Sequence, residues 1–246
     1  MIGREVKFQL TLFGDIASLL PTPNIIKQCV DIFMPLGMFP GHSQEIDFSA
    51  SEPLKIDRLA LHSIESGTTV NFLSNRVDIY KEFDVPEGQV LGGVSEFFSC
   101  AKIIVDLAAE SFDLKFHRAG MVFDIIFPPM ELNKIEEIRK DVLPGLVSLY
   151  GTQQVDWNFS TVERGVIGDL SGEQVNFGQT LVKVKAAFQN ESLEFDSIRV
   201  LLDINSIPEN NTPRFGPVHL DGFIKDGLES YKKYGAAIKE TINAYE

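Results

Sequence analysis

The sequence predicts an α+β fold built from two consecutive units, each with the element order β-α-β(3–4)-α. Two observations carry this prediction. The spacing of apolar residues switches between period two and the helical period in the same order in residues 1–113 and in residues 114–246. Prolines and glycines stand between these segments, where they end strands and helices. We therefore expect a largely antiparallel sheet with the helices on one face.

The first unit, residues 1–113, begins with a predicted strand at residues 5–12, where apolar and polar side chains alternate. Apolar residues at helical spacing follow at 25–36, and Gly37 is placed to end that helix. A long apolar stripe at 91–110 predicts the helix that closes the unit. Between the two helices, shorter strands are predicted at residues 59–61 and 70–72, with 77–79 either extending the second or forming a third.

The second unit, residues 114–246, begins with a predicted strand at 115–127. The prolines at 128–129 end this strand because proline cannot donate a backbone hydrogen bond to the ladder. Apolar spacing predicts a helix at 132–146 and a long final helix that starts at about Pro217. Three further strands are predicted at residues 155–159, 182–188 and 198–204.

The joint between the two units is short, so we expect pseudo-repeats within one compact body. In element order, this arrangement resembles the duplicated half of the TATA-binding-protein fold, in which two halves form a pseudo-twofold saddle. A helix-grip fold is the alternative, because a long C-terminal helix across a curved antiparallel sheet produces the same periodicity. The spacing of apolar residues is compatible with both.

The composition is that of a soluble globular protein, with 246 residues of which 44% are hydrophobic. No apolar run approaches the ~20 residues of a membrane-spanning helix. Charged residues at Arg4, Glu5 and Lys7 interrupt the region where a signal peptide would lie. We therefore expect a cytoplasmic protein without a membrane segment. Cys29 and Cys100 fall on apolar helical stripes, so we expect buried free thiols rather than a disulfide.

The net charge of −13 repels phosphate backbones, which disfavours nucleic acid as a ligand. An acidic surface suits a basic protein partner, although solubility alone also explains it. Unpaired sheet edges would also allow a homo-oligomer.

The sequence contains no motif of a known catalytic or cofactor site. His42, His62, His117 and His219 lack the paired spacing of a zinc site. Nucleotide-binding glycine motifs and nucleophile elbows do not occur. We therefore expect neither a cofactor nor a bound metal.

Polar side chains on two predicted strands form the candidate ligand site. His117, Arg118 and Asp124 lie on the strand that begins the second unit, and Asp203 and Asn205 lie on a later strand. If these strands are neighbours, the side chains converge into a site for acid–base chemistry or ligand binding. The alternative is a cross-strand ion pair with a turn at the strand end.

Two connections are candidate recognition loops. One spans residues 207–217 and contains Arg214 and Phe215, and the other spans residues 35–53 and contains Phe39 and His42. The alternative, which is the more frequent case for such segments, is that each is a simple connection.

Three segments resemble a sporadically distributed family of uncharacterised bacterial proteins of about this length: residues 117–125, residues 202–205, and the start of the final helix from His219. Asp124 departs from that family, where asparagine is frequent. The resemblance implies a bacterial source and no particular activity. Such scattered distribution often accompanies mobile or defence-associated genes.

Two classes of function remain. The first is a non-catalytic interaction or regulatory module, such as a neutraliser or a defence-complex subunit with an acidic binding surface. The second is a small-ligand-binding protein or hydrolytic enzyme with a polar pocket between the sheet and the long helices.

Overall fold

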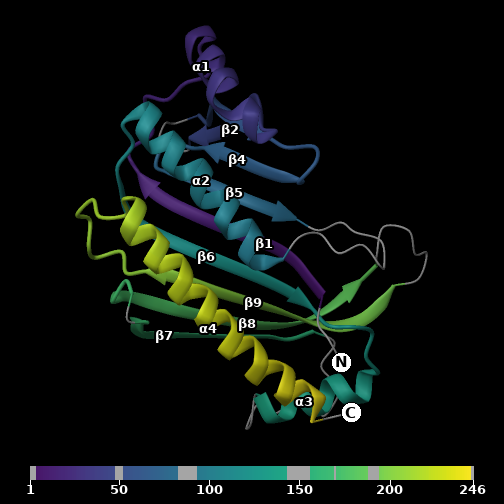
Figure 1. Ribbon diagram of the computed structural model, residues 1–246. Coiled ribbons are helices and arrows are strands. Elements are labelled where there is room, and N and C mark those ends of the chain that lie inside the picture. The colour runs from purple at the N-terminus through teal and green to yellow at the C-terminus, as the bar shows by residue number, and fades with distance from the viewer. Residues whose placement is uncertain are drawn as a thin grey trace.

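The computed structural model describes residues 4–47, 52–82, 93–142, 156–168, 170–187 and 194–244. Within these ranges, nine strands form a single antiparallel sheet that is accompanied by four α-helices (Figure 1). The predicted α+β class with one large antiparallel sheet is therefore confirmed.

The first part of the chain supplies five strands and two helices. They are β1 (Arg4–Gly14), α1 (Pro23–Phe33), β2 (Phe39–Asp47), β3 (Leu54–His62), β4 (Thr68–Phe72), β5 (Arg76–Glu82) and α2 (Val94–Phe112). Thr22 begins α1, because its Oγ1 accepts a hydrogen bond from the backbone N–H of Ile25 at 3.4 Å. A 3₁₀ turn (Met34–Leu36) follows α1, and Gly37 ends it with a φ of 70°, in the left-handed conformation that glycine adopts most readily.

The second part supplies four strands and two helices. They are β6 (Phe116–Ile126), α3 (Leu132–Val142), β7 (Asn158–Ile167), β8 (Glu173–Ala186), β9 (Phe195–Ser206) and α4 (Pro217–Asn243). Within the described ranges, no helix is both long and apolar enough to cross a membrane.

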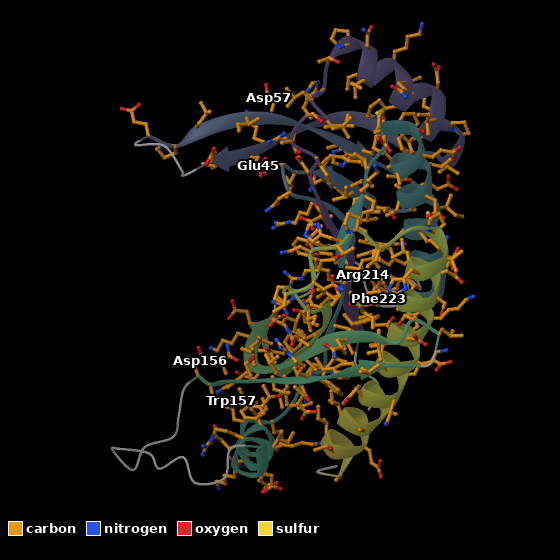
Figure 2. All side chains as sticks on the ribbon, turned by 90° about the vertical axis from the view of Figure 1, so that its left-hand side faces the viewer. Glu45, Asp57, Asp156, Trp157, Arg214 and Phe223 are labelled. Atoms are coloured by element: carbon orange, nitrogen blue, oxygen red, sulfur yellow. The ribbon has the colours of Figure 1, made fainter. Side chains whose placement is uncertain are left out.

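The strands follow the order β2-β3-β4-β5-β1-β6-β9-β8-β7, and each pair of neighbouring strands is antiparallel. The first strand of each part lies at the centre, where β1 pairs with β6. Figure 2 shows that the outer strands at both ends extend away from α2 and α4, so the sheet is curved and its face opposite these helices is concave.

The core lies between the convex face of the sheet and the helices. Phe8, Leu10 and Leu12 of β1 are fully buried on this face. Phe123 of β6 stacks on Tyr231 of α4, with ring centroids 4.2 Å apart. Because burying one such side chain contributes about 1.5–3 kcal/mol, this layer supplies most of the hydrophobic stabilisation.

Two predicted strands have the wrong bounds, and one edge strand was not predicted. The proposed loop at residues 35–53 contains the edge strand β2, and the strand predicted at 155–159 runs from 158 to 167 instead. The strand predicted at 182–188 begins at residue 173 and ends at 186. These stretches carry polar or glycine residues on one or both faces, so the alternation that marks a half-buried strand is weak there. The last part of the helix predicted at 132–146 lies outside the described residues.

Candidate functional site

The sheet has two chemically different faces. On β1, Phe8, Leu10 and Leu12 point toward the helices, so Gln9 and Thr11 point to the concave side. We call the helix-packed side the covered face and the concave side the open face. The strand register places these residues on the open face of the central strands: Lys7, Gln9 and Thr11 on β1, Asp78, Tyr80 and Glu82 on β5, Arg118, Val122 and Asp124 on β6, and Arg199, Leu201, Asp203 and Asn205 on β9.

A hydrogen-bonded carboxylate lies near the centre of the open face. Thr11 Oγ1 donates to Asp78 Oδ1 at 2.8 Å, and Gln9 Nε2 donates to the same oxygen at 3.3 Å. Arg76 Nε donates to the second oxygen at 2.8 Å. Asp78 is only 8% exposed, although none of the described helices lies over the open face. The curvature of the sheet and this network therefore shield the charge from water.

Two of the predicted ligand residues lie opposite the middle of β6. In the β6–β9 pairing, Asn205 is opposite Gly120 and Asp203 is opposite Val122. The missing side chain at Gly120 makes room for the amide, since a Cβ there would lie 2.1 Å from Asn205 Oδ1. Asn205 therefore occupies the space that a larger residue at position 120 would take.

Arg118 lies close enough to Asp203 for their charges to interact. Its guanidinium lies 4.5 Å from the ring centroid of Phe13, and its Nε donates to the carbonyl oxygen of Ser206 at 3.1 Å. Burial raises the pKa of the Asp203 carboxyl, although a hydrogen bond with Asn205 and the charge of Arg118 act in the opposite direction. Asp203 Oδ1 is buried and has no hydrogen-bond partner within the described residues. This group can hold a polar ligand atom.

Asp124 has a different role. It lies opposite Leu201 in the register and is 1% exposed. Arg199 Nε donates to its two carboxylate oxygens at 2.8 and 3.1 Å, and Arg199 Nη2 donates to it as well. Asp124 is therefore held in a cross-strand ion pair on the side of Leu201 away from Asp203.

His117 lies at a bulge in the β1–β6 pairing, between Phe116, which is opposite Gly14, and Arg118, which is opposite Phe13. Its carbonyl oxygen accepts a hydrogen bond from Arg214 Nη1. The expected convergence of Asp124 on Asp203 is wrong, because Arg199 holds Asp124 on the far side of Leu201, whereas Arg118, Asp203 and Asn205 are close together.

Arg214 and Phe215 are not available for recognition. Phe215 is 3% exposed and packs edge-on against Phe223, with centroids 5.4 Å apart. Figure 2 marks Arg214 and Phe223 near the middle of the molecule. Arg214 donates from Nη2 and Nε to the buried carboxylate of Glu173, at 2.5 and 3.1 Å. The expectation that these two residues form a recognition loop is wrong, because apolar burial and an ion pair fix them in the body.

Glu173 also accepts a contact from His219 Nε2, at 3.1 Å. Burial opposes the ionisation of Glu173, but hydrogen bonds and charge from Arg214 and His219 outweigh it and lower the pKa of this carboxyl. The group ties the start of α4 to the start of β8.

Phe39 and His42 are exposed, but they lie on the edge strand β2 rather than on a loop. Their backbone is fixed by antiparallel pairing with β3, where Phe39 is opposite His62 and His42 is opposite Leu59. An exposed edge strand can pair with another chain.

The described residues contain no group of three or more His, Cys, Asp or Glu side chains that could hold a metal. Cys29 and Cys100 are both free, as predicted. Burial raises the pKa of the Cys29 thiol to about 11 and also raises that of Cys100. Since the thiolate is the reactive form, neither cysteine is activated as a nucleophile.

Sequence reasoning missed the Asp78 network. On β5, Arg76, Asp78 and Tyr80 alternate with the apolar Val77 and Ile79, which is the pattern of a second polar row. Its significance depends on β1 lying beside β5, and the sequence does not state that adjacency.

Comparison with known proteins adds no functional assignment. No protein-family model matches the chain, and no curated protein matches its sequence. Its candidate function therefore rests on the geometry of the open face.

Proposed function

We propose that the protein is a non-catalytic interaction module that binds another protein on its open face. The observation that carries this proposal is the concave, helix-free side of the sheet, on which charged and amide side chains are held in fixed positions (Figure 2). A preorganised surface of this kind lowers the entropy that association costs.

The proposal includes an internal repeat. Apart from the additional edge strand β2, the strand order is symmetric about the β1–β6 pair, with β5, β4 and β3 on one side and β9, β8 and β7 on the other. A long helix ends each half, α2 in the first and α4 in the second. These features support two pseudo-repeats, 1–113 and 114–246, arranged as a TATA-binding-protein-like saddle. The position of α4 on the convex side weighs against a helix-grip fold, whose helix would lie within the curve.

The charges of the open face favour a protein over a nucleic acid. Lys7 Nζ lies 2.8 Å from Glu82 Oε1, and Arg76 and Arg199 pair with carboxylates in the same way. Because these cations are already neutralised, they offer little to a phosphate backbone. The same local balance means that the acidic excess of the chain is not concentrated here, so the partner need not be basic. We propose that the protein acts as a neutraliser of this partner protein or as a subunit of a defence complex with it.

The alternative, a ligand-binding or hydrolytic protein that uses the predicted polar residues, has weaker support. Arg199 holds Asp124 on the far side of Leu201 from Asp203, so these two carboxylates do not converge as the acid and base that hydrolysis would need.

The test begins with native mass spectrometry of the protein purified gently from its own host. A co-purifying protein is then prepared separately, and its affinity is measured by calorimetry against two variants. Val162→Glu changes an open-face residue of β7 that is 67% exposed, and Ile103→Glu changes a residue of α2 that is 50% exposed.

We expect Val162→Glu to weaken binding at least tenfold and Ile103→Glu to leave it unchanged, while both variants retain the unfolding midpoint of the wild type. Equal binding by both variants would place the interface elsewhere. A chain that carries a small molecule and no partner would support the ligand-binding alternative.

A further inference from the structure

A hollow of about 370 Å³ lies between the last turns of α2 and the segment that leads into α4. Figure 1 shows these two ends together at the left of the view, beside the start of β6. We call this site the α2–α4 hollow. Among the described residues that line it, Asp106, Lys115 and Arg214 are charged, and the others are apolar or glycine.

The base and sides of the hollow are apolar. Val105 of α2, Phe116 of β6 and Phe215 before α4 are buried in its base. Ala109 and Leu114 are half-buried at its sides, and two exposed prolines belong to the rim. A concave site with mostly apolar walls is typical of small-molecule sites, because burying apolar surface of the ligand releases water.

The segment before α4 is held in place by contacts within the chain. The backbone N–H groups of Arg214 and Phe215 both donate to the carbonyl oxygen of Phe116, at 2.9 and 3.0 Å. The Phe215 ring packs edge-on against Phe223 of α4. Since these contacts fix one wall of the hollow, a ligand does not have to order that wall when it binds.

Each of the three charged groups that line the hollow has a partner of opposite charge. The pairs are Asp106–Lys102 at 2.5 Å, Arg214–Glu173 at 2.5 Å and Lys115–Asp113 at 4.0 Å. The third pair is in contact with water, with side chains that are 70% and 91% exposed. A charged ligand would therefore lose hydration in the hollow without gaining an unpaired counter-charge, whereas an uncharged ligand has no such cost.

The volume of the hollow limits the size of the ligand. A dry apolar cavity of about 150 Å³ takes up benzene, so about 370 Å³ admits a body of two fused rings. The aromatic and proline rings of the walls present flat apolar surfaces, which a planar ring covers more fully than a flexible chain does.

We infer that the α2–α4 hollow binds an uncharged aromatic molecule of about two fused rings. The rings lie against Phe116 and Phe215, and any polar substituent points toward the exposed rim. The site lies among the helices of the covered face, so this inference does not depend on the function proposed for the open face.

The test is a titration of the full chain with 2-naphthalenemethanol, followed by NMR of the valine and leucine methyl groups. We expect the methyl signals of Val105 and Leu114 to shift saturably, because both side chains line the hollow. The methyl signals of Val122 and Leu201, which face the open side of the sheet, should not move. Without a saturable shift at Val105 and Leu114 up to the solubility limit of the probe, the inference is overturned.

Two probes with the same rings test the exclusion of charge. 2-Naphthoate carries a negative charge, and 2-naphthylmethylammonium carries a positive one. We expect each to bind at least fivefold more weakly than 2-naphthalenemethanol. Equal affinity of either charged probe would contradict the proposed ligand class.

Matched variants place the binding in the hollow. Ala109→Phe fills it from α2 and should weaken binding of 2-naphthalenemethanol at least tenfold, while Ala237→Phe, at an exposed position of α4 off the hollow, should leave it unchanged. Ala109→Glu places an unpaired carboxylate there and gives a second route to the same loss. Unfolding midpoints confirm that each variant is folded. Binding that survives both changes at Ala109 would overturn the inference.

The other possible occupant is an aromatic side chain of a partner protein. The partner that co-purifies with the chain is added to the same methyl-labelled sample. Shifts of Val105 and Leu114 with the partner, but not with 2-naphthalenemethanol, would make the hollow a protein contact and overturn the small-molecule inference.

Discussion

The same strands contribute apolar side chains to the covered face of the sheet and mainly polar side chains to the open face. On β6, Met121 and Phe123 are fully buried against helices, whereas the intervening Val122 faces the concavity. The covered face is shielded by apolar packing. None of the helices in the described ranges lies over the open face, yet Asp78 and Asp124 on it are at least nine-tenths buried.

The curvature of a sheet can therefore bury polar side chains without a second layer of helices over them. A concave sheet brings side chains of neighbouring strands together, and hydrogen bonds then compensate the desolvation of their charges. The covered face therefore determines the stability of the fold. The open face holds polar groups in fixed positions, which is what recognition needs.

The largest expected effect on stability comes from a substitution on the covered face. Phe123→Ala removes a fully buried ring that stacks on Tyr231, and we expect it to lower the free energy of unfolding by about 3–5 kcal/mol. Urea unfolding measures the loss. The matched control is Val122→Ala, the adjacent open-face residue, for which we expect a loss of less than about 1 kcal/mol. Similar losses at both positions would remove the distinction between the faces.

The second prediction concerns a polar group on the covered side. Glu173→Gln leaves the Arg214 guanidinium without its buried carboxylate and should cost about 3 kcal/mol at neutral pH. The pKa of Glu173 is lowered in the folded state, so its contribution is complete above the ordinary glutamate pKa of about 4.3. It is lost as the pH falls through the folded-state pKa.

Unfolding of the wild type and the Gln variant over a pH series checks this. The difference should be constant near neutrality and should shrink in acid. Glu163→Gln, at an exposed position on β7, serves as the control and should change the stability by less than about 0.5 kcal/mol. A difference that persists unchanged in acid would contradict an ionic role for Glu173.

The smallest expected effect is a gain in stability, from a substitution of Asp203 on the open face. Burial raises the pKa of Asp203, so its ionisation opposes folding once the pH exceeds the ordinary aspartate pKa of about 3.9. The loss grows as the pH rises toward the folded-state pKa. Asp203→Asn removes it and keeps a polar side chain beside Asn205. We expect a higher Tm at neutral pH and no difference in strong acid.

Thermal unfolding at both pH values measures the effect. Asp31→Asn on the exposed surface of α1 is the control and should not change the Tm at either pH. A lower Tm of the Asp203 variant at neutral pH would mean that the carboxylate is stabilising.

Much of the fold follows from local patterns in the sequence. Alternation at 5–12 predicted β1, and two prolines after Phe127 correctly marked the end of β6. The edge strands β2 and β7 were missed or misplaced, because an edge strand need not bury one regular face. The candidate site was predicted only in part. Arg118, Asp203 and Asn205 come together because β6 pairs with β9 in a register that places Asn205 over Gly120.

The periodicity of most strands and helices can be predicted from the sequence alone, and it shows which side chains of a strand share a face. The pairing of strands, the curvature of the sheet and the contacts across it are visible only in the tertiary structure. Val105 and Phe215 line one hollow, and Glu173 meets Arg214, although each pair is separated in the chain. The physical reason is that sheet pairing and helix packing join distant segments, so their register is a property of the whole fold.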